Sequence, residues 1–274
     1  MKKIILLTGA TGFLGKEVYK ILSSRDYEIK AISSVSYRLK NHIPCDLSNP
    51  KELIRLLHKV NPSIVINLAA KISFNASTVS SLYALNVLCP AIIADYCLNN
   101  DSLLLQASTI AVNGNNEKKY GVDTSFHPDT NYGKSKLYAD ELIQASGCNF
   151  TILRYGGIFG LNGPDHLGIN SAINNSVEGT VPSLIGTGDA IRNYIYVKDA
   201  AQALVKCFEE EITGIHYLGG EEKTIKSMLN DICDVFILGR KPEHIEGEEA
   251  VDQIIEKSDY FNITPFRIAL EQLV

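Results

Sequence analysis

Short apolar runs alternate with segments of helical spacing through the first 155 residues of the chain. Runs such as 4–7 and 63–69 are apolar almost throughout, which is typical of strands buried on both faces of a sheet. Segments between them, such as 50–60, repeat leucine every three or four residues, as an amphipathic helix does. This alternation predicts a parallel sheet with helices on both of its faces.

A glycine-rich stretch at 8–15, Thr-Gly-Ala-Thr-Gly-Phe-Leu-Gly, stands between the first apolar run and the first helical segment. In this context Gly9 suits a tight turn, Gly12 admits a pyrophosphate close to the backbone, and Gly15 lets the helix pack against the strand. The N–H groups at the helix N-terminus would then bind the phosphates. A glycine-rich turn without a ligand is the alternative, and the position directly after an apolar strand favours a dinucleotide site.

The remaining elements follow from the same patterns. Strands are predicted at 27–33, 43–46, 102–107 and 150–155, and helices at 79–98 and 132–145. Beyond 155 the pattern predicts helices near 169–178 and at 199–210, and strands at 193–197 and 216–218. We therefore predict an α/β fold, a Rossmann-type doubly wound parallel sheet. A dinucleotide-binding domain would span 1–155, and a smaller substrate-binding part would span 156–274 with elements that return to the main sheet.

Composition narrows the possible partners. The 274 residues, 45% of them hydrophobic, suffice for one large domain or one and a half. A net charge of −5 predicts no nucleic-acid partner, and the absence of an apolar run near ~20 residues predicts no membrane partner. Two lysines and then a strand open the chain, without a signal-peptide pattern. Six scattered cysteines lack C-x-x-C spacing, which predicts reduced thiols, no metal site and a cytoplasmic protein.

The stretch Tyr132-Gly-Lys-Ser-Lys136 is the first candidate for chemistry. On a helix, Tyr132 and Lys136 lie four residues apart and therefore on one face. A nearby ammonium favours the ionised form of a tyrosine, so we expect Lys136 to lower the pKa of Tyr132. Tyr132 would then exchange a proton with an alcohol or ketone during hydride transfer. Two surface residues at the start of an amphipathic helix are the alternative.

Ser108 and Thr109 follow the strand predicted at 102–107. Active sites of open parallel sheets lie at such carboxyl ends, where a hydroxyl is able to position a reacting oxygen. A polar pair that merely closes the strand is the alternative.

In this order, the stretches resemble the extended short-chain dehydrogenase/reductase superfamily, in particular its NAD-dependent epimerase/dehydratase family of nucleotide-sugar enzymes. The resemblance runs nearly end to end and rests on 8–15, Cys45-Asp46-Leu47, Asn67-Leu68-Ala69-Ala70, Asn86-Val87, Thr109, Tyr132 with Lys136, Leu153-Arg154-Tyr155, Phe159-Gly160, and the segment 192–199.

The resemblance implies a role for these residues. Thr109, Tyr132 and Lys136 would be catalytic, and Ser108 and Thr109 would contact the substrate. Arg192 would contact the diphosphate of a sugar nucleotide, a task that suits the two-pronged guanidinium. The cofactor would be bound by Gly9, Thr11, Gly12, Phe13, Leu14, Gly15, Asp46, Leu47, Leu68, Ala69, Ala70, Asn86, Tyr132, Lys136 and Tyr155.

The end of the second strand bears on which cofactor binds. NAD-binding chains usually carry an acidic residue there for the ribose 2′-OH, whereas this chain reads Ser33-Ser34-Val35-Ser36-Tyr37-Arg38. Ser33 and Arg38 would bind the cofactor, because hydroxyls and a guanidinium accommodate a 2′-phosphate. Solvated loop charges at Arg38 and Lys40 are the alternative. The sequence thus favours NADP(H) over NAD(H).

Three departures from the family limit what the resemblance implies. Ile110-Ala111 follows Thr109 where the family's 4,6-dehydratases have Asp-Glu, so this chain is not expected to remove water. Asn67 stands in place of the common His. The C-terminal part is also short for the family.

The sequence favours an NAD(P)-dependent oxidoreductase that reduces a 4-keto group on a nucleotide-linked sugar. Tyr132 would donate the proton, Thr109 would hold the keto oxygen, and Lys136 would hold the cofactor ribose. A nucleotide-sugar 4-epimerase with retained NAD and a reductase of a small non-nucleotide ketone or aldehyde stay open. A cofactor-sensing protein without activity on the same fold is a further class.

The helices at 79–98 and 132–145 carry apolar residues over more than one stripe, including Leu88, Ile92, Tyr138 and Leu142. The resemblance implies that these helices pair with those of a second copy in a four-helix interface. Such an isologous contact would bury the second apolar side, so we expect a homodimer. Cover by loops or by the C-terminal segment is the alternative.

Overall fold

The computed structural model describes residues 2–34, 39–72, 79–115 and 117–274. Arg38, which the sequence predicts at the cofactor, lies outside these residues. The chain divides into two compact units. The first comprises Met1–Asn115, Ser125–Arg154 and Ala201–His216, and the second comprises Asn116–Thr124, Tyr155–Ala200 and Tyr217–Val274.

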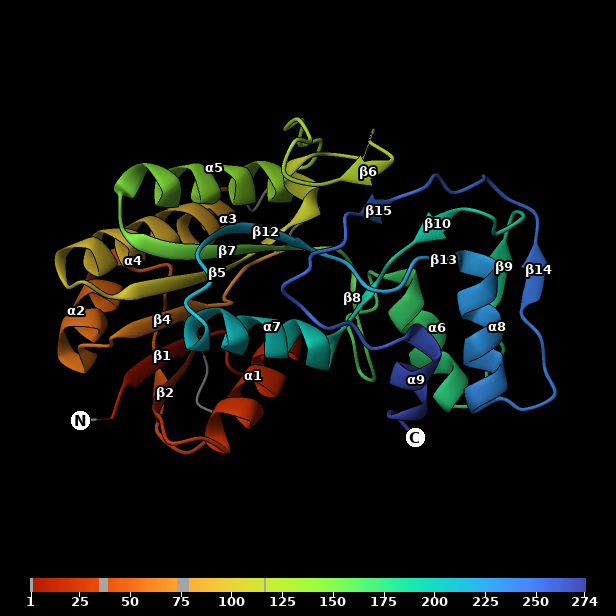
Figure 1. The fold of residues 1–274 in the computed structure, drawn as a ribbon, viewed down its shortest axis with the longest axis horizontal. Coiled ribbons are helices and arrows are strands. Elements are labelled where there is room, and N and C mark those ends of the chain that lie inside the picture. Colours follow the sequence, from red (N-terminus) through yellow and green to blue (C-terminus); the bar gives the residue numbers. More distant parts are fainter. Residues whose placement is uncertain (1, 35–38, 73–78, 116) are drawn as a thin grey trace. The chain divides into compact units, whose positions relative to one another are not determined.

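Within the described residues, a seven-stranded sheet forms the centre of the first unit (Figure 1). Its strands are β1 (Ile4–Thr8), β2 (Glu28–Ser33), β3 (His42–Pro44), β4 (Ile64–Asn67), β5 (Leu103–Thr109), β7 (Asn149–Tyr155) and β12 (Gly214–Leu218). The parallel strands are ordered β12-β7-β5-β4-β1-β2-β3. The winding reverses between β1 and β4, where ligands of such sheets bind beyond the carboxyl ends. The predicted doubly wound α/β fold is therefore confirmed.

Helices cover both faces of this sheet (Figure 1). On one face, α2 (Pro50–Val60), α4 (Cys89–Asn99) and α5 (Asn131–Ser146) share a core with the strands, in which Leu6, Val65 and Leu104 are buried. The other face carries α1 (Phe13–Ser23) and α7 (Val197–Glu209). Side chains alternate between the two faces of a sheet along each strand. Thr8, Asn67 and Gln106, each two residues after one of these core residues, therefore lie on the same face as the core.

The helix predicted at 79–98 is a continuous helical run made of α3 (Val79–Tyr83), a π turn η2 (Ala84–Leu88) and α4. Pro90 explains the π turn, because it has no N–H group for the carbonyl of Asn86 four residues earlier. The backbone instead bonds from the Cys89 N–H group to the Ala84 carbonyl. The wider turn displaces Asn86 from regular helical register.

This helical run, Val79–Asn99, is long and apolar enough to cross a membrane by length and composition alone, with a mean hydropathy of 1.5. Buried helices of water-soluble proteins meet the same criterion. Here 44% of the most apolar stretch is buried inside the unit, and α4 packs against both α2 and α5. The run therefore belongs to the helical layer on the sheet, and its remaining exposed apolar residues need a cover.

The second unit consists of short strand pairs and helices. Its elements are β6 (Lys119–Tyr120), β8 (Ile158–Phe159), α6 (Gly168–Val177), β9 (Ser183–Ile185), β10 (Ile191–Arg192), β11 (Ile195–Tyr196), β13 (Lys223–Thr224), α8 (Ile225–Phe236), β14 (Glu243–Ile245), β15 (Ile254–Ile255) and α9 (Phe266–Glu271). The strand predicted at 193–197 is shorter than expected. Its first residue, Asn193, uses its side-chain amide to bond both the N–H and the carbonyl group of Ile255, at 3.0 and 2.7 Å.

Candidate active site

The glycine loop between β1 and α1 needs glycine at two positions. Gly9 has a left-handed backbone, with φ of +64°, and a Cβ atom there would lie 2.9 Å from the Ala69 nitrogen. A Cβ atom on Gly15 would overlap the Gly9 carbonyl oxygen. Gly9 therefore allows the loop to lie against the segment after β4, and Gly15 allows α1 to lie against the loop.

Gly12 has a different environment at the N-terminus of α1. It is exposed, and a Cβ atom there would meet only the Gly9 carbonyl oxygen, at 3.2 Å. Gly12 forms no side-chain cap, and the first turn of α1 holds no acidic residue. The positive dipole end of α1 therefore has no capping side chain and no acidic residue of its own. A pyrophosphate fits this surface, and Thr11, Phe13 and Leu14 lie half-buried beside it.

The hydroxyl group of Thr8 ties the glycine loop to the segment that follows β4. Thr8 Oγ1 accepts hydrogen bonds from the backbone N–H groups of Leu68 and Ala69, both at 3.1 Å. Ala70 is exposed directly beyond them. The segment predicted to run along the cofactor is thus fixed at the carboxyl end of β1.

The two hydroxyls at the end of β5 have different surroundings. Ser108 is buried, and its Oγ donates to Asp140 Oδ2 at 2.8 Å. Thr109 is half-buried and ends the strand, and its Oγ1 accepts from the Ala111 N–H group at 3.2 Å. Thr109 thereby caps the short 3₁₀ turn η3 (Ile110–Val112). The Ser108 hydroxyl is thus engaged with the buried Asp140, whereas the Thr109 hydroxyl makes no bond to Asp140.

Close packing of α5 on η3 brings the tyrosine to the end of β5. The Thr130 side chain caps α5 by accepting from the Gly133 N–H group at 3.0 Å. A Cβ atom on Gly133 would overlap the Ala111 carbonyl oxygen, so the glycine allows the helix to touch η3. Tyr132 therefore stands in the turn of α5 that packs on η3, directly after Thr109. One turn further on, Lys136 Nζ donates to the Ala107 carbonyl at 2.6 Å.

Burial dominates the protonation of both side chains. It raises the pKa of Tyr132 to about 12, and the Asp140 carboxylate acts in the same direction. It lowers the pKa of Lys136 to about 8, against the opposing effect of Asp140. The expected lowering of the Tyr132 pKa was wrong, because desolvation and the Asp140 carboxylate both raise it. At neutral pH the tyrosine therefore keeps its proton, and the lysine is mainly charged.

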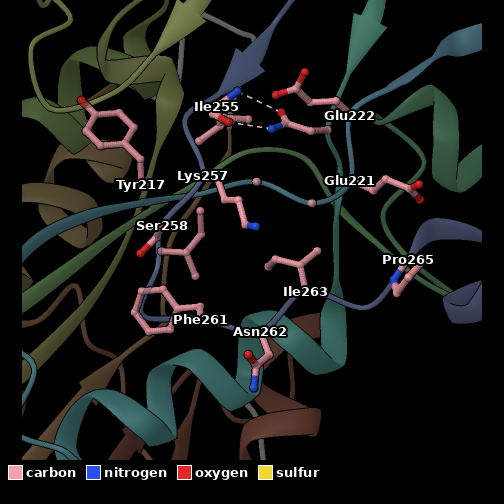
Figure 2. Close-up of a pocket in the computed structure, with 14 residues that line it drawn as sticks. Tyr217, Glu221, Glu222, Ile255, Lys257, Ser258, Phe261, Asn262, Ile263 and Pro265 are labelled. Atoms are coloured by element: carbon pink, nitrogen blue, oxygen red, sulfur yellow. Dashed lines mark hydrogen bonds between the residues drawn. The ribbon is translucent and has the colours of Figure 1, made fainter.

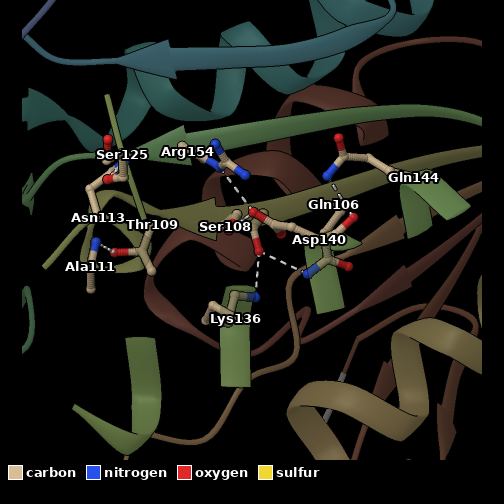
Figure 3. A network of polar contacts seen from close by, with 11 residues as sticks. Gln106, Ser108, Thr109, Ala111, Asn113, Ser125, Lys136, Asp140, Gln144 and Arg154 are labelled. Carbon is tan, nitrogen blue, oxygen red and sulfur yellow. Dashed lines mark hydrogen bonds and ion pairs between the residues drawn. The ribbon is translucent and has the colours of Figure 1, made fainter. Parts of the chain in front are cut away.

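Asp140 was missed by the sequence analysis. It follows Lys136 by four residues on α5 and is fully buried, and burial raises its pKa. Besides Ser108, its Oδ2 accepts from Arg154 Nε at 3.0 Å (Figure 3). The Arg154 guanidinium also lies over the Phe126 ring, at 4.6 Å. The equal spacing of the tyrosine, the lysine and this aspartate was the available signal.

A family model of NAD-dependent epimerases and dehydratases matches residues 5–218. The match extends from β1 to β12 and includes the glycine loop, Thr109 and the tyrosine–lysine pair. This chain belongs to the NAD-dependent epimerase/dehydratase family. It is accordingly an NAD(P)-dependent enzyme of the extended short-chain dehydrogenase type.

Relatives within the family catalyse different reactions. The chain is 29% identical over 216 residues to a dTDP-4-dehydrorhamnose reductase of Aggregatibacter actinomycetemcomitans, covering 77% of this chain and 69% of the relative. Its fold matches the crystal structure of a UDP-N-acetylglucosamine 4-epimerase from Bacillus cereus with a TM-score of 0.85 at 22% identity, covering 99% and 98% of the two chains. It also matches a dTDP-4-dehydrorhamnose reductase from Bacillus anthracis in complex with NADP, with a TM-score of 0.82 at 18% identity, covering 100% and 98%.

Asn86, which the family resemblance places at the cofactor, lies in the π turn and is buried. Its Oδ1 accepts from the Lys71 N–H group at 2.8 Å, and its Nδ2 donates to the Lys71 carbonyl at 2.9 Å and to Ser135 Oγ at 3.0 Å. Asn86 therefore holds the backbone after β4 against α5. Any contact of its own with the cofactor stays a prediction.

The predicted 2′-phosphate and adenine residues lie at the ends of β2 and β3. Ser33 is buried, and its Oγ lies 2.8 Å from His42 Nε2. Asp46 is exposed, and its Oδ1 accepts from the N–H and hydroxyl groups of Ser48, while Leu47 is buried. The cofactor roles of these residues stay predictions.

Tyr155 and Arg192 belong to the second unit. Tyr155 is buried, and its hydroxyl donates to the Ala200 carbonyl at 3.0 Å. Arg192 is half-buried, and its guanidinium donates to the backbone carbonyls of Ile191 and Val251. The predicted contact of Arg192 with a diphosphate stays a prediction.

The second unit also holds a pocket of about 580 Å³. Figure 2 shows the Lys257 amine pointing into it, with Glu221 on the far side and Phe261 and Ile263 around it. The pocket is lined by none of the residues that the sequence predicted for the site.

Proposed function

We propose that this enzyme reduces the 4-keto group of a nucleotide-linked 6-deoxy sugar with NADPH. The bound nicotinamide would supply the hydride to the carbonyl carbon. Tyr132 donates its phenolic proton to the carbonyl oxygen, while Thr109 holds that oxygen in place. Lys136 binds the cofactor ribose through its ammonium. The observation that carries the proposal is the packing of the first turn of α5 on the 3₁₀ turn after Thr109, which puts Tyr132 near that hydroxyl and Lys136 one turn further on, against the end of β5. Reduction of a ketone needs such a proton donor beside a group that holds the carbonyl oxygen.

The residues after Thr109 support a reductase over a dehydratase. Loss of water from a sugar needs an acid and a base near the reacting carbons. Ile110 and Ala111 occupy η3, where they supply no ionisable group, and Asp140 is enclosed with Arg154 and Ser108. Keto-group reduction needs only the tyrosine proton and a hydride.

The choice of NADPH over NADH rests on the end of β2. Ser33 ends this strand where NAD-binding chains usually carry a carboxylate, and its hydroxyl and the nearby His42 bring no negative charge that would repel a 2′-phosphate. One structural relative was crystallised with NADP, and another, an enzyme from Bordetella bronchiseptica, with NAD⁺.

The test is a panel of nucleoside-diphosphate 4-keto-6-deoxyhexoses assayed with NADPH and with NADH. The proposal predicts NADPH oxidation in proportion to the keto sugar reduced. Interconversion of 4-hydroxy epimers by protein that retains NAD would instead identify a 4-epimerase. Reduction of simple ketones or aldehydes, with no response to any nucleotide-linked sugar, would identify a small-ketone reductase.

We further propose a cytoplasmic homodimer formed through the helical run 79–99 and α5. Four apolar side chains on these helices are about half exposed: Leu88 at 45%, Leu98 at 51%, Tyr138 at 46% and Leu142 at 45%. The isologous pairing of such a face with a second copy removes it from water. All six cysteines are free and buried, which suits a reducing compartment.

A further inference from the structure

A row of buried polar side chains crosses the sheet from the glycine loop to Lys136. Thr8 Oγ1 donates to Asn67 Oδ1 at 2.6 Å, and Asn67 Nδ2 donates to Gln106 Oε1 at 2.8 Å. Gln106 Nε2 donates to the Ala107 carbonyl at 2.9 Å. That carbonyl also accepts the bond from Lys136, so Lys136 and Gln106 meet at one oxygen atom (Figure 3).

The backbone fixes the direction of every bond in this row. Because Thr8 Oγ1 accepts from the N–H groups of Leu68 and Ala69, its own hydrogen is left to donate to Asn67 Oδ1. Asn67 must then present its Nδ2 group to Gln106. Gln106 in turn presents its Nε2 group to the Ala107 carbonyl. Each amide orientation thus follows from the one before it.

The row lies in the buried interior of the sheet, where a polar group without a hydrogen-bond partner costs free energy. Thr8 lies opposite Asn67 in the β1–β4 ladder, and Asn67 lies opposite Gln106 in the β4–β5 ladder. The three side chains are at most 1% exposed. A buried polar group left without its partner costs about 1–3 kcal/mol. Two residues earlier the same strands carry Leu6, Val65 and Leu104 on this face, so an apolar layer would also fit.

We infer that Asn67 and Gln106 are positioning residues for Lys136. They fix the Ala107 carbonyl, so that the ammonium keeps one N–H group on this oxygen and directs its others to the cofactor and Tyr132. The far end of the row is the Thr8 hydroxyl, which anchors the segment packed against Gly9. The lysine and the cofactor loop therefore belong to one rigid polar layer.

The chemistry of position 67 follows from this direction. The residue must accept from Thr8 and donate to Gln106, which the amide of asparagine does. A neutral imidazole has one acceptor nitrogen and one donor nitrogen and preserves both bonds. An ionised aspartate has acceptors alone, so Gln106 would have to turn its oxygen toward the Ala107 carbonyl. Ionised Asn67→Asp therefore keeps the bond from Thr8 but turns the Gln106 amide around, with almost no change in volume, whereas Asn67→His retains both bonds.

The test is a double-mutant cycle on cofactor binding. We expect Gln106→Leu to weaken binding of the preferred nicotinamide cofactor about tenfold, measured by fluorescence titration, because a charge-assisted bond loses its geometry. In the Lys136→Met background the same substitution should cost less than about twofold. Asn67→Asp should repeat the loss, and Asn67→His should bind within about threefold of wild type.

Ser102→Ala is the matched control, because Ser102 is a buried residue directly before β5 that donates to the Pro62 carbonyl. It should lower the melting temperature without changing cofactor affinity. Equal losses for Gln106→Leu with and without Lys136 would overturn the inference, as would equal affinities for Asn67→Asp and Asn67→His. The inference rests on the proposed function for the role of Lys136. The titration uses no sugar, so a failure of the reductase proposal leaves this test intact.

Discussion

Tyr132 and Lys136 illustrate how burial sets the chemistry of single residues. Desolvation keeps the tyrosine protonated and brings the pKa of the lysine to about 8, into the range where it titrates. The tyrosine therefore carries its proton in the resting enzyme, as an unperturbed tyrosine would at neutral pH. This order of protonation agrees with keto-group reduction, in which the alkoxide formed by hydride addition takes up one proton.

Tyr132→Phe should lower kcat for keto-sugar reduction at least about 100-fold, because it removes the general acid. The cofactor dissociation constant should stay within about threefold of wild type, since the ring remains. Tyr138→Phe on the same helix is the control and should leave kcat unchanged. A Tyr132→Phe enzyme with more than about a hundredth of wild-type kcat would contradict the proton-donor role.

Cofactor binding should weaken as the pH rises through about 8. The lowered pKa means that the Lys136 ammonium is present below pH 8 and is lost above it, and a lost charge-assisted bond costs about tenfold in affinity. Titrations between about pH 6.5 and 9.5 measure this effect. Lys136→Met should bind weakly with a flat profile, and a wild-type profile that is equally flat would contradict the assignment.

At the scale of elements, glycines and one proline decide how the site is assembled. Gly15 lets α1 touch the backbone of the glycine loop, and Gly133 lets α5 touch η3. Pro90 forces the π turn that carries Asn86 to the segment after β4. Each of these residues acts by its effect on the backbone, and each lies beside a catalytic or cofactor-binding segment.

Gly12→Val and Gly15→Ala should have opposite effects on stability and binding. A side chain at Gly12 meets only the Gly9 oxygen at 3.2 Å, so the fold should survive while the space for the pyrophosphate is lost. A side chain at Gly15 overlaps the Gly9 backbone and should lower the melting temperature. Thermal melts and cofactor titrations separate the two. Normal cofactor affinity in Gly12→Val would refute the phosphate site.

The sequence predicted best those elements that a local pattern delimits. For α2, the proline suited to a first helical turn, Pro50, and the leucine spacing that follows it gave the bounds that the structure has. β5 extends to Thr109, two residues beyond the prediction, which ended the strand at the first polar residue. Ser108 is polar but buried, where its hydroxyl bonds to Asp140. The row from Thr8 to Gln106 was not predicted, since it depends on the register between strands. The sequence does show polar residues at the ends of these apolar strands, and that was the available signal for the row.

At the scale of the whole molecule, the exposed apolar side chains on α4 and α5 call for a partner surface. Light scattering should give a mass of about 60 kDa, twice the 30.1 kDa of the chain. Leu142→Glu should shift the protein toward single chains, because it places a charge in the contact. Ile268→Glu is the matched control, since Ile268 on α9 is equally exposed, at 46% against 45%. A wild-type mass near 30.1 kDa, or binding to lipid vesicles, would contradict the dimer.

The most direct measurement of the proposed reaction follows the hydride itself. The enzyme is supplied with NADPH that carries deuterium at the transferable position and with a nucleoside-diphosphate 4-keto-6-deoxyhexose. We predict that the product carries deuterium at C4 and that one NADP⁺ is released for each sugar reduced. A product without deuterium, formed by protein that retains its NAD, would contradict the account.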